Sequence, residues 1–161
     1  MIDRRGASGL ALITVVALSG CSSHSSGVEL RGSDLGVVKI GAPFEDAVSK
    51  ISTVLGEPTS DPATGRLCPG SSREVAWRQL RIGEQGGLLF GWVSTSGDLR
   101  SNLGIGVGSR ESDLQEAYGD KVALLPATTG VNSFSIEKLG LAGNIDASGI
   151  VSALFSGGCG A

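Results

Sequence analysis

The clearest pattern along the chain is a run of apolar residues at helical spacing in residues 43–55. Pro43 suits the first turn of a helix, where a missing N–H costs little, and Gly56 suits its C-terminal end. Apolar residues that recur every three or four positions fall on one side of a helix. The sequence therefore predicts a helix over 43–55 with one buried face, formed by Phe44, Val48, Ile51 and Leu55.

A second stretch repeats this layout with a shorter helix. Ser109 is a good N-cap residue and Gly119 a helix stop, so residues 110–118 are expected to be helical. Each helix follows a short apolar segment with glycines, residues 35–40 before the first and 103–107 before the second, and both segments are typical of strands. The repetition predicts two related strand–helix–strand units, with chance similarity in a glycine-rich chain as the alternative.

Alternating apolar and polar residues indicate strands in the rest of the chain. Residues 74–82 and 87–95 are expected to form a hairpin around a turn at 83–86. One face of its second strand is expected to carry Leu88, Phe90 and Trp92. The C-terminal third is expected to form two or three further antiparallel strands, from residues 132–137, 139–145 and 149–155. These elements predict an α+β fold, an antiparallel sheet with two short helices packed on one face.

Residues 1–20 have the layout of a secretory signal peptide. A short basic segment precedes an apolar run, residues 10–18, which is too short to span a bilayer as a permanent helix. Small residues then lead to Cys21. The segment Leu18-Ser19-Gly20-Cys21 resembles the lipobox of bacterial lipoproteins, in which the signal is cut before the cysteine and the thiol carries a diacylglycerol. An ordinary signal peptide with Cys21 near its cleavage site is the alternative.

The resemblance to lipoproteins sets the expected domain boundaries. Residues 1–20 would be removed, residues 21–34 would form a lipidated flexible tether, and residues 35–161 would fold as a single α+β domain. A diacylglyceryl group anchors a protein firmly, because two acyl chains bury more CH₂ groups than one. We therefore expect the protein to be held in the cell membrane through Cys21, facing outside the cytoplasm.

The chain has three cysteines, and two remain once Cys21 is assigned to lipid. Export places Cys68 and Cys159 in an oxidising compartment, where an even pair is expected to form a disulfide. The bond would join the loop after the first helix to the C-terminal end, with the two Cα atoms within about 7 Å. Two free thiols or two metal ligands are the alternatives, although two cysteines without a histidine partner make a poor zinc site.

Charge and composition narrow the possible partners. The formal net charge of the whole chain is −3, and the sequence lacks clusters of basic residues, which argues against binding to nucleic acid. Only 4% of the residues are aromatic, and 26 are glycine. The core is therefore expected to consist mainly of valine, isoleucine, leucine and alanine.

Catalytic chemistry is not expected. The one histidine, His24, lies in the predicted tether, which excludes serine–histidine and cysteine–histidine mechanisms. The glycine-rich segment 104–110 lacks the lysine of a phosphate-binding loop. We therefore expect no catalytic residue, no metal ligand and no cofactor. Acidic pairs lie in the first turns of the predicted helices, where stabilisation of the helix dipole explains them: Glu45 with Asp46, and Glu111 with Asp113.

Two groups of residues could take part in binding. Trp77 and Trp92 could form a ligand platform, but in a core poor in aromatic residues we expect them to be packing residues. Arg78 and Arg81 lie beside Trp77 in the sequence and could bind an anion, although a solvated strand face is the simpler explanation. The sequence therefore assigns no ligand-binding residue.

The two-unit layout is loosely similar to β-lactamase-inhibitor-like folds and to small lipoproteins of the outer-membrane assembly machinery. The best match runs from Ile40-Gly41-Ala42-Pro43 through Val54-Leu55-Gly56. The resemblance implies an antiparallel sheet with short helices. Its motif is structural, so no binding residue is carried over from it.

Together these features indicate a membrane-anchored extracytoplasmic lipoprotein that acts as a non-enzymatic binding or protein-interaction module, with an unknown protein as its partner. The alternative is a small-ligand carrier or an enzyme with an unrecognised site. A deep pocket beside Trp77 or Trp92 would favour a carrier, whereas an exposed flat or concave sheet would favour a protein partner.

Overall fold

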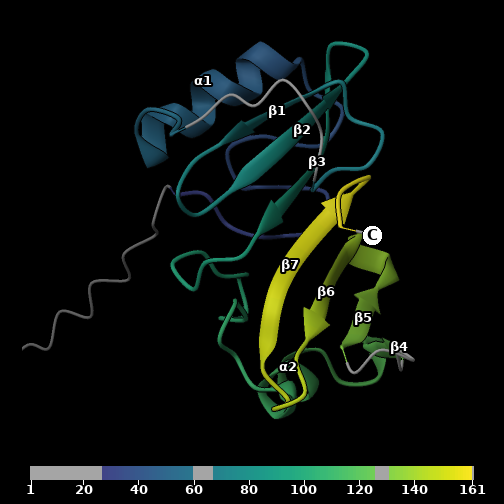
Figure 1. Cartoon of the computed structure of the whole chain (residues 1–161). Coiled ribbons are helices and arrows are strands. Elements are labelled where there is room, and N and C mark those ends of the chain that lie inside the picture. Colours follow the sequence, from purple (N-terminus) through teal and green to yellow (C-terminus); the bar gives the residue numbers. More distant parts are fainter. Residues whose placement is uncertain (1–26, 60–66, 126–130, 161) are drawn as a thin grey trace, which may run out of the picture.

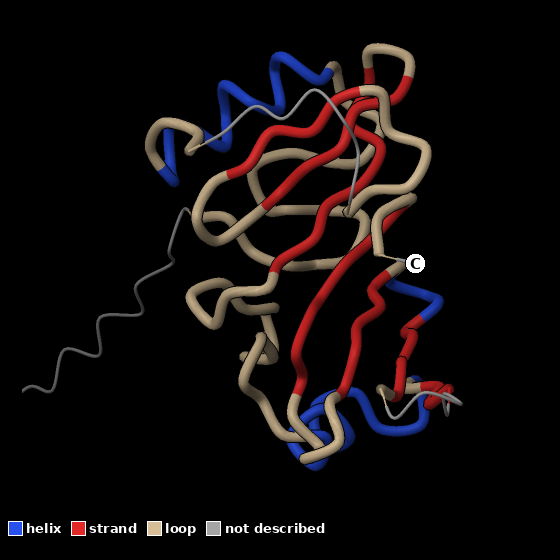
Figure 2. The backbone as a smooth tube through the Cα atoms, viewed as in Figure 1, coloured by secondary structure: helices blue, strands red, loops and turns tan. Residues whose placement is uncertain are grey.

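The fold is built around one antiparallel sheet (Figure 1, Figure 2). The structure is a computed structural model and describes residues 27–59, 67–125 and 131–160. Seven strands follow the order β1-β2-β3-β7-β6-β5-β4. In chain order the elements are α1 (Phe44–Leu55), β1 (Arg73–Ala76), β2 (Arg81–Gln85), β3 (Leu88–Ser94), α2 (Glu111–Tyr118), the 3-10 turn Gly119–Lys121, β4 (Ala123–Leu125), β5 (Asn132–Ile136), the 3-10 turn Glu137–Leu139, β6 (Leu141–Ile145) and β7 (Val151–Gly157).

The predicted α+β class is confirmed, and both helices pack on the same face of the sheet. Ile51 of α1 and Leu114 of α2 belong to one continuous core with Trp92 of β3 and Leu154 of β7. All four side chains are fully buried. We call this side of the sheet the core face and the opposite side the outer face.

Helix α1 confirms the predicted helix, and Ala47 joins its predicted buried face. Phe44, Ala47 and Ile51 are buried, and Val48 and Leu55 are half-buried and pack against the same core. The sheet therefore meets the side of α1 that carries the small Ala47, which lets helix and sheet approach closely. Gly56 ends the helix with a φ of 85°, a backbone conformation that glycine adopts without strain.

Helix α2 also lies where it was predicted, but its N-cap is different. Arg110 takes the N-cap position, and its backbone N–H donates to Asp113 Oδ2 at 3.0 Å. Ser109, the expected N-cap, is buried, and its hydroxyl oxygen accepts from the N–H of Gly106 at 3.1 Å. Ser109 therefore orders the loop before the helix and does not cap the helix itself.

The strand predicted at 74–82 is wrong, because the chain turns within it. The N–H of Trp77 donates to the carbonyl of Leu80 at 2.7 Å, which closes a tight turn between β1 and β2. Two antiparallel strands replace one long strand. The turn contains no glycine or proline, so the usual sequence signal of a turn is missing.

The hairpin between β2 and β3 also departs from the prediction. Strand β2 continues through the expected turn, and the chain reverses after Gln85. The register shifts between Gly83 and Glu84, a bulge that places Leu89 in the core beside Trp92. Leu88, expected on the same face of the strand as Trp92, is 46% exposed, whereas Trp92 is buried. The bulge breaks the simple alternation on which the prediction relied.

Neither short strand before the helices forms. Residues 35–40 and 103–107 fold as loops, each beside a single bridge: Asp34 with Lys39, and Arg100 with Gly106. Their central apolar residues, Val38 and Ile105, are still buried in the core. The apolar pattern therefore identified buried segments correctly but assigned them the wrong backbone conformation.

The C-terminal strands β5, β6 and β7 confirm three predicted strands, with boundaries moved by one or two residues. The predicted turn before β7 is also present, because the N–H of Gly149 donates to the carbonyl of Asp146 at 3.0 Å. Strand β4 was not predicted. Its three residues are all exposed, and it extends the sheet beyond β5.

Two halves of the chain share one contact at the start of each helix, although the strand predicted before each helix does not form. We call α1 with β1–β3 unit 1, and α2 with β4–β7 unit 2. In unit 1 the N–H of Gly41 donates to the carbonyl of Leu89, and in unit 2 the N–H of Gly108 donates to the carbonyl of Val151, each at 2.8 Å. Both glycines have positive φ, 88° and 90°. Each helix start is thus fixed to the last strand of its own unit.

The pairing of β3 with β7 relates the two units by an approximate two-fold axis. Trp92 lies three residues after Leu89, and Leu154 lies three residues after Val151, so Trp92 and Leu154 occupy equivalent positions in the two units. Ser94 and Ser156, five residues after the same two contacts, are equivalent in the same way. The ladder pairs Trp92 with Ser156 and Ser94 with Leu154. Exchanging the units therefore converts one of these pairs into the other, and the sheet is continuous across the axis.

The folded part begins before the expected boundary at residue 35. Val28 and Leu30 are buried in the core, so residues 28–34 are packed and do not belong to a tether. Cys21 and His24 lie outside the described residues. In the part of the chain that the structure describes, no helix is long and apolar enough to cross a membrane.

Candidate functional site

The outer face of unit 1 carries a disulfide between Cys68 and Cys159, as the cysteine count predicted. The two Cα atoms lie 3.8 Å apart, within the expected limit. Both cysteines are buried, and they pack with Val93 and Phe155 near the two-fold axis. The bond joins the loop before β1 to the chain end after β7.

A row of glycines makes room for this disulfide. Gly83, Gly91 and Gly157 lie side by side on β2, β3 and β7. A Cβ atom at Gly83 would lie 2.8 Å from Cys68 Cβ, and one at Gly91 would lie 2.8 Å from Cys159 Sγ. Contacts this short require the chain to shift, so a larger residue at either position would displace the disulfide.

A buried carboxylate holds the disulfide loop from beneath. Glu74 Oε1 accepts from the N–H groups of Leu67 and Cys68 at 3.0 and 2.9 Å, and Oε2 accepts from Arg81 Nη1 at 3.1 Å. Burial tends to raise the pKa of Glu74, but the hydrogen bonds from Cys68, Arg81 and Leu67 outweigh it and hold the pKa below the ordinary value of 4.5. Glu74 is therefore ionised and structural.

Both tryptophans are packing residues. Trp77 and Trp92 are buried, and their indole N–H groups donate to the carbonyls of Gly56 at 2.9 Å and Gly32 at 2.7 Å. These bonds fix one end of α1 and the N-terminal segment to the sheet. The rings thus do not form an exposed platform for a ligand.

The two arginines of the anion hypothesis have separate partners. Arg78 Nη2 contacts Asp98 Oδ2 at 3.1 Å, and Arg81 contacts the buried Glu74. Glu45, in the first turn of α1, contacts Arg73 at 2.6 Å. Each of these charges has a local structural role.

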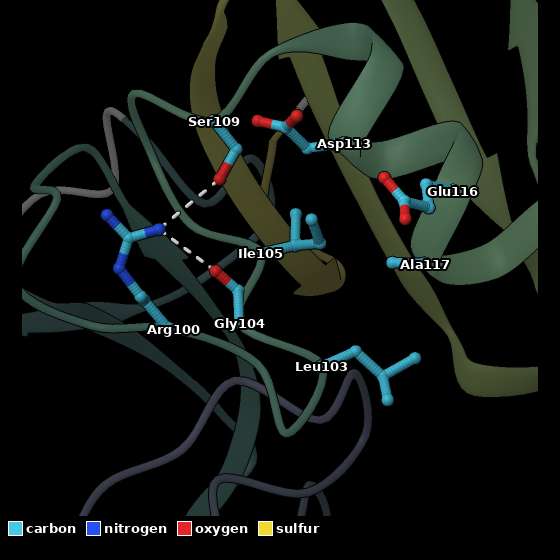
Figure 3. Close-up of a pocket in the computed structure, with 8 residues that line it drawn as sticks. All are labelled: Arg100, Leu103, Gly104, Ile105, Ser109, Asp113, Glu116 and Ala117. Atoms are coloured by element: carbon cyan, nitrogen blue, oxygen red, sulfur yellow. Dashed lines mark hydrogen bonds between the residues drawn. The ribbon is translucent and has the colours of Figure 1, made fainter.

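A hollow of about 500 Å³ opens between α2 and the loop that precedes it (Figure 3). Arg100 Nη1 donates to Gly104 O at 2.9 Å and to Ser109 Oγ at 3.3 Å, which fixes the guanidinium at one wall. Figure 3 shows the carboxylates of Asp113 and Glu116 on the opposite wall. Its remaining lining is Leu103, Ile105 and Ala117. The hollow combines both charge signs with an apolar floor but contains no nucleophile–base pair.

The outer face of unit 2 differs from that of unit 1. Figure 1 shows β5, β6 and β7 side by side, with no described element in front of them. The ladder places two rows of side chains on this face: Ser133, Asn144 and Ala153, and Ser135 and Ala142. The second row continues to Phe155, which packs against the disulfide and belongs to the covered part of the sheet. The other five are half-buried, and none is charged. We call these five residues the open face.

Sequence reasoning found the disulfide but missed the other features of both outer faces. The glycine row depends on strand register, which no local pattern reports. Glu74 carries a charge, and charged residues are usually placed at the surface. Among the described residues, no three histidine, cysteine, aspartate or glutamate side chains are grouped as metal ligands would be.

Comparisons with known proteins add little to this description. No protein-family model and no curated protein matches the chain. A solved structure, an extracellular protein containing an SCP domain from Bacillus anthracis str. Ames, aligns with a TM-score of 0.49 and 11% sequence identity. The alignment covers 78% of this chain and 46% of that one, so the chain spans under half of its length. A likeness at this TM-score carries no argument about function.

Proposed function

We propose that the protein is a lipid-anchored, extracytoplasmic binding module that recognises a protein partner through the open face of unit 2. The observation that carries the proposal is the contrast between the two outer faces. The disulfide and its loop cover unit 1, whereas the corresponding strands of unit 2 present uncharged side chains to solvent. A covered face serves stability, and an uncovered one is available for binding.

The chemistry of the open face suits a protein surface. Serine and asparagine side chains offer hydrogen-bond donors and acceptors, and the alanine side chains offer apolar area. Uncharged residues carry a smaller desolvation cost than charged ones when a partner covers them. The face is part of a rigid sheet, so little conformational entropy is lost on binding.

Two features support a location outside the cytoplasm. The disulfide is enclosed in the fold, and structural disulfides of this kind persist in oxidising compartments. The N-terminal sequence has the order of a signal peptide followed by the lipobox-like segment that ends at Cys21. Lipid on Cys21 would hold the domain at the membrane.

The lipid anchor is tested by mass spectrometry of the mature N-terminus. The proposal expects a first residue Cys21 with a mass increase equal to a diacylglyceryl group. Cys21→Ala should leave an uncut precursor or release the protein from membranes. A mature-sized Cys21→Ala product that stays in the membrane would contradict the proposal.

The binding surface is tested with a photo-crosslinking residue introduced at Ser135, on the open face, in intact cells. Ser49, an exposed serine of α1, is the matched control position. We expect a protein adduct of one discrete mass from position 135 and none from position 49. The same adduct from both positions, or from 49 alone, would show that the partner does not use the open face.

A small-ligand carrier is the second candidate, and the hollow beside α2 is the observation that favours it. The hollow is the place to look for a ligand if crosslinking excludes the open face. Arg100→Ala would then be expected to weaken binding, because it removes the guanidinium at one wall.

A further inference from the structure

The described chain begins beside the loop that carries Leu103. The N–H of Leu30 donates to the carbonyl of Arg100 at 3.0 Å, and the N–H of Glu29 donates to the carbonyl of Leu35 at 3.0 Å. Figure 3 shows the purple N-terminal segment passing below the loop with Leu103. The point at which the chain enters the fold is therefore close to this loop.

The chain between Cys21 and the fold is short. Five residues lie between Cys21 and Gly27, and a fully extended chain over these six steps spans at most about 20 Å. That reach is shorter than a small domain is wide. Lipid on Cys21 would consequently keep the N-terminal end of the domain near the bilayer surface.

The same end of the domain carries an apolar side chain without cover. Leu103 is 50% exposed, more than the other described large apolar residues except Leu125 on β4. An exposed leucine next to a lipid anchor gains free energy by entering the apolar part of the membrane interface.

The charges at this end permit such a contact. Arg31 pairs with Glu29, and Lys39 lies 3.9 Å from Asp34, so these four charges offset one another. Arg100 is exposed and lies in the same loop as Leu103. The guanidinium of an arginine next to the bilayer can contact lipid phosphates while the aliphatic part of its side chain lies along the apolar surface. Asp113 and Glu116 lie across the hollow, on α2 (Figure 3).

We infer that the loop of residues 100–105 rests on the membrane, with Leu103 in the lipid interface and Arg100 at the phosphate level. The inference rests on the proposed lipid attachment at Cys21. It fixes the orientation of the domain, with the N-terminal segment and this loop toward the bilayer.

The test places a photo-crosslinking residue at position 103 of the full chain. Position 88 is the matched control, since Leu88 is 46% exposed and begins β3, where it pairs with Pro43 at the start of α1. Each protein is isolated from membranes, and mass spectrometry of the peptide that contains Cys21 establishes whether it is lipidated. The protein is then reconstituted in vesicles of phosphatidylethanolamine and phosphatidylglycerol, irradiated, and examined for peptide–lipid adducts.

We expect about tenfold more lipid adduct at position 103 than at position 88, the preference given by burying one leucine-sized side chain. Equal yields from lipidated protein would overturn the inference and leave the proposed anchor intact. Protein without lipid on Cys21 would overturn the anchor and, with it, the orientation.

Discussion

Unit 1 and unit 2 share the contact between helix start and last strand, but they treat the outer face of the sheet differently. In unit 1 the disulfide lies on a row of glycines, and Glu74 binds the loop that carries it. In unit 2 the equivalent side of the sheet carries small uncharged side chains without such a loop in front. The same backbone frame thus supports a closed face and an open one.

The difference originates in the segment that follows each helix. Residues 56–72 connect α1 to β1, and Cys68 in this connection forms the disulfide with Cys159. After α2 the chain makes one short 3-10 turn and then adds β4 to the edge. The described end of the longer connection, residues 67–72, lies against the outer face of unit 1, whereas the shorter connection leads into β4 at the sheet edge.

Removal of the disulfide should have the largest effect on this contrast. The bond closes a loop with a sequence separation of 91 residues. In the chain-entropy model, Cys68→Ala combined with Cys159→Ala should lower the free energy of unfolding by about 4 kcal/mol. Urea denaturation of the purified domain measures the change. A loss below about 1 kcal/mol would mean that the disulfide is not what holds the outer face of unit 1 closed.

Truncation of Ile51 should have the next largest effect on stability. Ile51 is fully buried where α1 meets the sheet, whereas Val54, on the same helix, is 38% exposed. Ile51→Ala should cost about 2–5 kcal/mol in unfolding free energy, because it removes apolar contacts and leaves a cavity. Val54→Ala is the control and should change stability by less than about 0.5 kcal/mol. Similar losses from both variants would show that the buried face of α1 is misassigned.

Substitutions on the two outer faces should change the stability by different amounts in unit 1 and unit 2. Gly91→Ala places a Cβ atom 2.5 Å from the carbonyl oxygen of Ser156 and 2.8 Å from Cys159 Sγ, and should cost about 1–3 kcal/mol. Ala142→Val enlarges a side chain on the open face, and should change stability by less than about 0.5 kcal/mol. Thermal unfolding of both variants gives the comparison. A large loss from Ala142→Val would mean that the open face is packed against another part of the protein.

The smallest expected effect is the acid sensitivity of unit 1. Because the pKa of Glu74 lies below 4.5 in the folded state, its contribution to stability is complete above about pH 4.5 and is lost as the pH falls through the lower folded value. Glu74→Gln keeps an acceptor for the loop and removes the charge, so it should cost about 1 kcal/mol at neutral pH and flatten this part of the pH profile. An unchanged slope of stability against pH below 4.5 would contradict the role of Glu74.

The sequence predicts the helices and the disulfide better than it predicts the strands of the sheet. Both helices were found because their apolar spacing and glycine stops are local signals. The turn at Trp77 carries no glycine or proline. The register shift between β2 and β3 leaves Phe90 without a partner on β2, which changes the alternation along β3. Strand β4 is too short for its pattern to stand out. The errors therefore lie where the backbone is set by contacts between strands.

The candidate site depends even more on long-range contacts. The disulfide was predicted from the cysteine count and the expected oxidising compartment, without any knowledge of strand register. The alignment of Gly83 with Gly91, and of Ser135 with Ala142, exists only once the strands pair. A surface made of serine, alanine and asparagine carries no sequence signal of its own, because these residues also occur in loops.

The contrast between the two outer faces is tested most directly by solvent accessibility of matched alanine methyl groups. Ala76 in unit 1 and Ala142 in unit 2 belong to one ladder row that crosses the sheet, and Ala76 is 5% exposed. A soluble gadolinium chelate should broaden the NMR methyl signal of Ala142 several-fold more than that of Ala76. Equal protection of both methyl groups would show that the outer face of unit 2 is covered, and would contradict its assignment as the open binding face.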